Sequence, residues 1–93
     1  MVLWTFKDDV PQAERDAIVA AVRGLRATVP SLRSLEIGEN VSPERARGYM
    51  HVLVETFDDL DGLAAYQSDP VHVPVAARLR EATSQLLAVD LEV

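Results

Sequence analysis

The apolar residues of the chain follow two kinds of pattern, and the first is typical of β-strands. Short runs that alternate, or that are rich in β-branched and aromatic residues, occur at residues 1–6, 32–39, 49–57 and 87–93. The first run carries an aromatic pair, Trp4 and Phe6, and the last alternates leucine and valine with small or acidic residues. Such alternation over a few residues predicts four strands.

The second pattern is typical of helices. From Pro11 to about Ala27, apolar residues recur at spacings of three and four, which gives one apolar helix face. Proline is favourable in the first turn of a helix, where its missing N–H would have no partner. We therefore expect the first helix to begin beside Pro11.

Two further helices are expected between the third and fourth strands. Asp58 and Asp59 can cap a short helix over residues 60–66. The Asp69-Pro70 pair predicts a break, after which a longer helix should run to about residue 87. Pro74 leaves two alternatives: either it sits in the first turn of this helix, or residues 70–73 form a separate turn.

This order of elements predicts an α+β fold of the ferredoxin-like kind, with a four-stranded antiparallel sheet and helices on one face. The length predicts that residues 1–93 form a single domain. The central strands are apolar on both faces: Leu53 points one way, while Val52 and Val54 point the other. A sheet face in water should be polar. We therefore expect a homodimer, a dimeric α+β barrel, in which two sheets pack face to face.

Composition narrows the classes of function. The net charge is −6, with nine basic and fifteen acidic side chains, which disfavours nucleic acids and anionic membranes as partners. The absence of cysteine excludes disulfides, thiol catalysis and zinc–thiolate sites. Two histidines are too few to predict a metal site. With no signal-peptide pattern and no long apolar run, the expected location is cytoplasmic.

The two histidines and a tyrosine are the candidate functional residues. His72 lies near a helix start, where a neutral imidazole that can accept a proton is favoured over the cation; otherwise it is a surface residue. Tyr66 can donate a hydrogen bond to a developing oxyanion, or it simply packs in the core. His51 alternates with Tyr49 and Leu53, so these three either line a pocket or belong to the core, and Glu55 on the same face is expected at an exposed strand end.

Three segments together resemble the stress-responsive A/B barrel (Dabb) family. They are the opening Val2-Leu3-Trp4-Thr5-Phe6-Lys7-Asp8-Asp9, the stretch from Leu32 to Ser42, and Ala65-Tyr66-Gln67-Ser68-Asp69-Pro70-Val71-His72. The closing Val89-Asp90-Leu91-Glu92-Val93 also fits. The resemblance implies a dimeric α+β barrel over nearly the whole chain.

The resemblance also implies a site. A plant polyketide cyclase of this family closes a linear polyketide by aldol condensation, without a cofactor, and its tyrosine–histidine pair matches Tyr66 and His72. Its pocket histidine matches His51. Two departures are that the family's first-strand histidine falls before Met1, and that Asp69 replaces the first histidine of a His-Pro-x-His motif. The chain is therefore expected either to be cyclase- or lyase-like, with an apolar or polyketide-like ligand, or to be a non-enzymatic, stress-associated binding or interaction protein.

Overall fold

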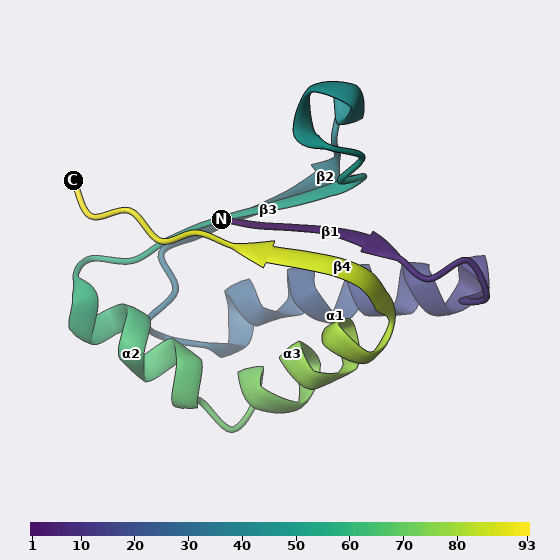
Figure 1. The fold of residues 1–93 in the computed structure, drawn as a ribbon. Coiled ribbons are helices and arrows are strands. Elements are labelled where there is room, and N and C mark those ends of the chain that lie inside the picture. Colours follow the sequence, from purple (N-terminus) through teal and green to yellow (C-terminus); the bar gives the residue numbers. More distant parts are fainter.

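A computed structural model describes all 93 residues. The elements are β1 (Val2–Phe6), α1 (Gln12–Thr28), β2 (Ser34–Glu39), the 3-10 helix η1 (Pro43–Ala46), β3 (His51–Thr56), α2 (Leu60–Ser68), α3 (His72–Glu81) and β4 (Thr83–Ala88). The four strands form one antiparallel sheet in the order β2-β3-β1-β4. All three α-helices lie on one face of this sheet (Figure 1), so the ferredoxin-like prediction is confirmed.

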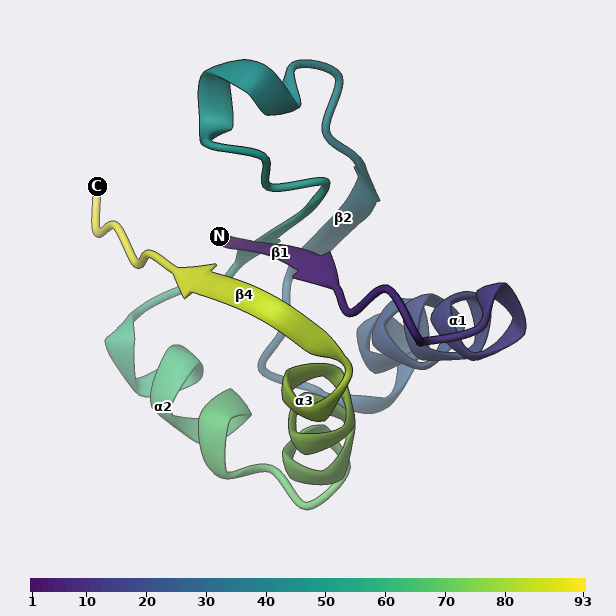
Figure 2. The ribbon, with the colours of Figure 1, turned by 45° about the vertical axis from the view of Figure 1, so that its right-hand side comes forward.

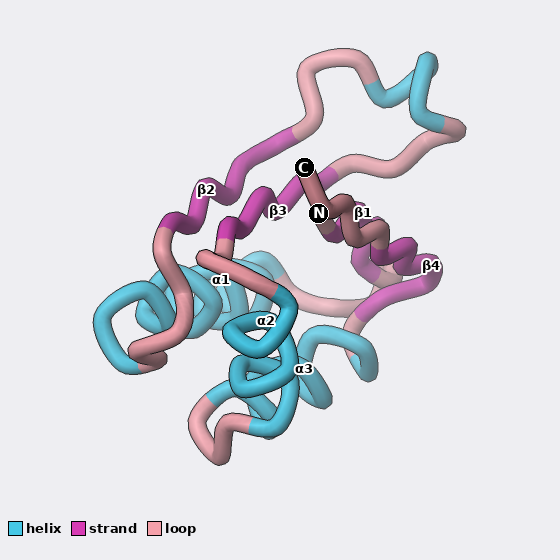
Figure 3. Tube along the Cα trace, turned by 90° about the vertical axis from the view of Figure 1, so that its left-hand side faces the viewer, coloured by secondary structure: helices cyan, strands magenta, loops and turns pink.

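The sheet and the helices form two layers (Figure 3), and the core lies between them. Trp4 and Phe6 project from β1 into this layer and are 0% and 3% exposed. The apolar face of α1 covers them with Ile18 and Val22. The three- and four-residue spacing of the first helix therefore buries the face that the sequence indicates.

Two aspartates lie at the two ends of α2. Asp59 caps α2, since its carboxylate accepts a hydrogen bond from the Gly62 N–H at 2.8 Å. Asp69 ends that helix, and its Oδ1 accepts from the Val71 N–H at 2.8 Å, one residue before α3 begins at His72. Pro74 is thus the third residue of α3, which selects the first of the two alternatives for it.

The boundary between the last helix and the last strand was predicted wrongly. The helix α3 ends at Glu81 and not near residue 87, and β4 spans Thr83–Ala88 and not residues 87–93. Gln85 belongs to the strand because it pairs with Thr5 of β1, and Ser84 lies at the register shift between this pair and the Phe6–Thr83 pair. Both polar side chains also hydrogen-bond to Thr5. Beyond the Val2–Ala88 pair the alternating leucines and valines are exposed, with Leu91 at 85%.

The loop between β2 and β3 also differs from the expected irregular segment. Its charged residues form the short helix η1, which projects away from the three helices (Figure 2). Arg47 and Gly48 then take left-handed backbone angles, with φ of 54° and 84°. The chain leaves this turn at Tyr49, and β3 begins at His51, two residues later than predicted.

The face of the sheet opposite the helices carries an apolar row. Leu3 pairs with Val52 on one side and with Leu87 on the other. Val54 and Leu87 are 37% and 46% exposed.

No helix of the fold is both long enough and apolar enough to cross a bilayer.

Candidate functional site

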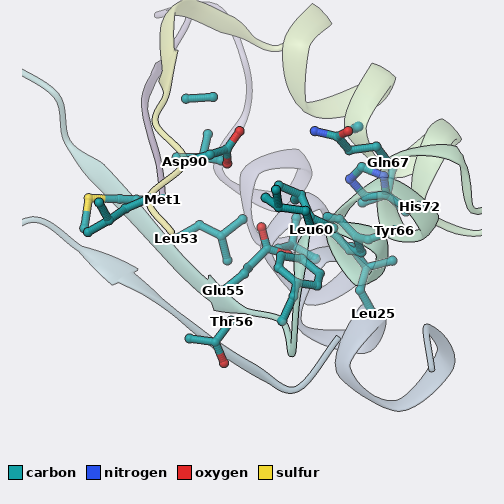
Figure 4. A pocket seen from close by; sticks show the side chains of 18 of the residues that line it. Met1, Leu25, Leu53, Glu55, Thr56, Leu60, Tyr66, Gln67, His72 and Asp90 are labelled. Carbon is teal, nitrogen blue, oxygen red and sulfur yellow. The ribbon is translucent and has the colours of Figure 1, made fainter. Parts of the chain in front are cut away.

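A pocket of about 500 Å³ opens between β3, β4 and the two short helices. Most of its wall is apolar: 16 of the 25 lining residues are hydrophobic. The polar groups lie together in the close view (Figure 4), with Glu55 near Tyr66, and Gln67 and His72 beside them. An apolar cavity of this size with a few convergent polar groups is typical of small-molecule sites.

Tyr66 and His72 meet in the wall of this pocket. Tyr66 comes from the last turn of α2 and is 5% exposed, and His72 is the first residue of α3. Their ring centroids are 3.8 Å apart with an angle of 31° between the planes. Phe57 packs on Tyr66 from the end of β3, at 5.1 Å between centroids. The tight turn at Asp69 and Pro70 is what brings the two helix ends together.

The surroundings of His72 favour its neutral form. Burial lowers the pKa of the imidazole, although the nearby backbone carbonyls of Gln67 and Tyr66 act in the opposite direction. The Nδ1 atom is buried and has no hydrogen-bond partner. His72 is therefore half-buried against Tyr66 and is not the freely exposed residue of the alternative interpretation.

Glu55 is a pocket residue that the sequence interpretation placed at an exposed strand end. It lies on β3 two residues after Leu53, on the same face of the strand, and both line the pocket. Strict two-residue alternation was the signal that could have placed it there. Burial raises the pKa of its carboxyl group, while hydrogen bonding with the Tyr66 hydroxyl lowers it. Its Oε2 atom is buried and has no hydrogen-bond partner.

The Tyr66 hydroxyl keeps its proton throughout the neutral range. Burial raises the pKa of this phenol, and the hydrogen bond to Glu55 and the charge of Glu55 raise it further. A protonated phenol can donate one hydrogen bond. Glu55 and any bound ligand therefore compete for that single donor.

His51 and Tyr49 lie apart from this pocket, although they were expected to share it. His51 stacks on Trp4, with 5.5 Å between ring centroids, and lines a second, smaller hollow of about 370 Å³ against α1. Tyr49 precedes β3 and lines neither hollow. Of the residues expected beside the candidate pair, Leu53 alone reaches the pocket.

Trp4 separates the two hollows. Along the inner face of β1, Val2 lines the first hollow and Phe6 the second, and Trp4 stands between them and is fully buried. Its indole therefore keeps His51 away from Tyr66 and His72. Because Trp4 pairs with His51 across the sheet, the stacking follows from the strand register.

No group of three or more histidine, aspartate or glutamate side chains converges in a way that could hold a metal ion. The polar groups gathered around the Tyr66–His72 contact are a carboxyl, a phenol, an imidazole and an amide. These groups can hydrogen-bond a ligand and exchange a proton with it.

Comparison with curated proteins finds plant relatives. The chain is 31% identical over 65 residues to a stress-response A/B barrel domain-containing protein of Arabidopsis thaliana; the match covers 70% of this chain and 25% of that protein. It is 23% identical over 91 residues to olivetolic acid cyclase of Cannabis sativa, covering 97% of this chain and 90% of the cyclase. The chain therefore spans about a quarter of that Arabidopsis protein but nearly all of the cyclase.

Solved structures share the fold over almost the whole chain. The Arabidopsis thaliana protein At3g17210 matches with a TM-score of 0.89 and 25% identity, covering 98% of this chain and 89% of that one. A dimeric ferredoxin-like protein of unknown function from Bacteroides fragilis matches with a TM-score of 0.76 and 30% identity, covering 99% and 91%. Hydroxynitrile lyase from Passiflora edulis matches in fold, with a TM-score of 0.86, 21% identity and coverage of 92% and 82%.

A family model described as the stress responsive A/B barrel domain (Dabb) matches residues 1–93. This match agrees with the sheet order, with the helices on one face and with the relatives above. The chain therefore belongs to the stress responsive A/B barrel domain family.

Proposed function

We propose that this chain binds a small, largely apolar molecule in the 500 Å³ pocket and catalyses proton transfer next to a carbonyl group there, without a cofactor. The observation that carries the proposal is the contact of the Tyr66 and His72 rings, 3.8 Å apart, in the wall of that pocket. The similarity to olivetolic acid cyclase supports ring closure of a polyketide-like substrate as the reaction.

In this mechanism His72 is the general base. Its neutral imidazole takes a proton from the carbon between two carbonyl groups, and the carbanion attacks a second carbonyl of the same molecule to form a C–C bond. Tyr66 donates a hydrogen bond to the oxygen on which negative charge develops. The proton held by His72 then passes to the new alkoxide, so the condensation consumes no proton. Leu53 forms part of the apolar wall that holds the substrate.

A non-enzymatic binding protein is the second candidate, and Glu55 is the observation that favours it. An ionised Glu55 attracts the proton of the Tyr66 hydroxyl. When that hydroxyl donates to Glu55, no donor is left for a developing oxyanion. The pocket would then hold a ligand without transforming it. His51 and Tyr49, expected as ligand contacts, have a part in either function only if the smaller hollow at His51 also takes ligand.

We also propose that the functional unit is a homodimer. The apolar row at Leu3, Val52 and Leu87 lies on the face opposite the helices. Solved relatives of this fold from Bacteroides fragilis and Thermobifida fusca are described as dimeric. Packing two such rows together would remove apolar surface from water, which is the main driving force for such association.

The test is turnover of a linear 3,5,7-triketo thioester with an apolar tail, in which attack of C2 on the C7 carbonyl closes a six-membered ring. Mass spectrometry then identifies the ring-closed product. Loss of a general base costs about 10²–10⁴-fold in rate, so His72→Gln should remove turnover and Tyr66→Phe should lower it. His51→Gln is the matched control because it changes the other histidine, which lies outside the pocket. Ligand binding without any product would overturn the enzymatic proposal in favour of the binding protein.

A further inference from the structure

We infer that the pocket selects an apolar molecule with an ammonium group and rejects one with a carboxylate. This inference rests on the proposal that the pocket binds a small molecule, but not on the proposed chemistry. Its basis is the placement of Glu55, which the apolar walls enclose at the centre of the pocket (Figure 4).

The hydrogen-bonding capacity of Glu55 is largely unused. Its carboxylate interacts with the Tyr66 hydroxyl, and its Oε2 atom is enclosed by protein without a donor. A carboxylate has room for about four hydrogen bonds, and leaving a buried charge without compensation is costly. A ligand that brings a positive charge into the pocket supplies this compensation.

The other charged groups around the pocket add to its negative charge. The lining side chains include five carboxylates, at Glu55, Asp58, Asp59, Asp90 and Glu92, and one guanidinium, at Arg80. Asp58 pairs with Arg33 and Asp59 caps α2, so these two are already engaged. The amino group of Met1 donates to the Val89 carbonyl, and its positive charge offsets part of the negative charge of Glu55. The interior charge is therefore that of Glu55, with Asp90 and Glu92 adding to it from the exposed side.

The walls suit the apolar part of such a ligand. Leu53, Leu63 and Val75 provide aliphatic surface, and Phe57 and Tyr66 provide aromatic rings. An ammonium group is attracted to aromatic rings as well as to a carboxylate. A cationic head beside Glu55 and a carbon skeleton along these walls would use both features of the pocket. A carboxylate in the same place would face Glu55 across a poorly screened interior.

The experiment compares three probes that differ only in their head group: 4-propylbenzylamine, 4-propylbenzyl alcohol and 4-propylbenzoate. Each is titrated into the full chain at neutral pH, and NMR shifts at Tyr66 and His72 report binding in this pocket. We expect the amine to bind tightest and the benzoate weakest, about tenfold or more apart, as suits a poorly screened charge contact. Glu55→Gln should bring the three dissociation constants to within about threefold of one another, because only the charge is lost.

Two further variants complete the test. Glu44→Gln makes the same change at an exposed position outside the pocket and should leave the ranking intact. Glu55→Asp keeps the charge and should preserve the order of the three probes. Benzoate binding as tightly as the amine would overturn the inference while the pocket proposal stands. A ranking that survives in Glu55→Gln would also overturn it, and failure of all three probes to bind would overturn both.

Discussion

At the scale of single residues, three ionisable groups from three elements define the pocket. Glu55 comes from β3, Tyr66 from α2 and His72 from α3. Burial acts on all three in the direction of the neutral form, raising the pKa of the carboxyl and the phenol and lowering that of the imidazole. A charge brought close to these three side chains should therefore shift their pKa values.

The raised pKa of Glu55 predicts how the stability of the fold depends on pH. Between the usual value of 4.5 and the raised value, the folded chain binds a proton that the unfolded chain does not, so stability falls as pH rises through that range. Above that range the wild type carries the full cost of the buried charge. Glu55→Gln should therefore raise the melting temperature at pH 7, and the gain should shrink as pH falls towards 4.5.

Thermal unfolding followed by circular dichroism at a series of pH values measures this gain. Glu44→Gln, at an exposed position, should leave the melting temperature unchanged at every pH. A uniform loss of stability in Glu55→Gln at all pH values would mean that the side chain stabilises the fold through its packing and not through its charge.

The lowered pKa of His72 makes a second prediction. In an NMR titration its ring protons should shift with a midpoint below 6.5. The neutral base is lost as pH falls through that midpoint, so any turnover should decline on the acid side with the same apparent value. A midpoint at or above 6.5 would show that the imidazole is solvated, and would remove the electrostatic argument for its role as a base.

At the scale of elements, the pocket depends on how the short helix α2 is anchored. Asp59 is its cap, and Tyr66 sits at its other end. Loss of such a cap costs about 0.5–2 kcal/mol, and for a domain of this size about 1 kcal/mol lowers the melting temperature by roughly 4–8 °C. Asp59→Ala should show a loss of this order, and Asp59→Ser should recover most of it because serine also caps.

Asp61→Ala is the matched control for the cap, since it removes an acidic residue from the first turn of the same helix. The two variants should differ in chemical denaturation. Equal destabilisation by both would mean that the general negative charge near the helix start matters, and not the hydrogen bond to the Gly62 N–H.

The elements also show how far sequence patterns reach. The periodicity of Ile18, Val22 and Leu25 is a local property, and it placed α1 to within one residue at each end. The start of β4 is not a local property: Ser84 and Gln85 carry no strand pattern, and Gln85 is part of the sheet because Thr5 of β1 lies opposite it. Non-local pairing of this kind is invisible in a window of a few residues.

Some features of the candidate site could likewise be predicted from the sequence, and others depend on how the chain packs. Tyr66 and His72 were placed together through their motif, and the Asp69-Pro70 turn brings them into contact. Alternation along β3 predicts that Glu55 lies on the same face as Leu53. Whether that face is buried at Glu55 depends on how far the pocket extends along the strand, which the sequence does not show. The separation of His51 could not be read from alternation, because it depends on how far the Trp4 ring fills the interior.

At the scale of the whole molecule, the uncovered sheet face makes the prediction on assembly. Val52→Glu would place a charge in the middle of the apolar row and should give monomers or unfolded protein, as sedimentation velocity would reveal. Val41→Glu is the matched control: it makes the same change at a side chain that is 97% exposed and should leave assembly unchanged. A wild-type chain that sediments as a stable monomer at micromolar concentration would refute the dimer.

Trp4 has a consequence for the length of molecule that the fold can accept. Trp4 is fully buried on β1 between Val2, which lines the first hollow, and Phe6, which lines the second, and we expect its ring to limit how far a ligand tail can extend. Replacing it with a small residue would cost about 3–5 kcal/mol, so shortening to leucine is the gentler change. Such a variant would join the hollow at His51 to the one at Tyr66, and tails several carbons longer would gain affinity. The size of the side chain at Trp4 should therefore limit the length of the ligand, and relatives with a smaller residue at this position should take longer ligands.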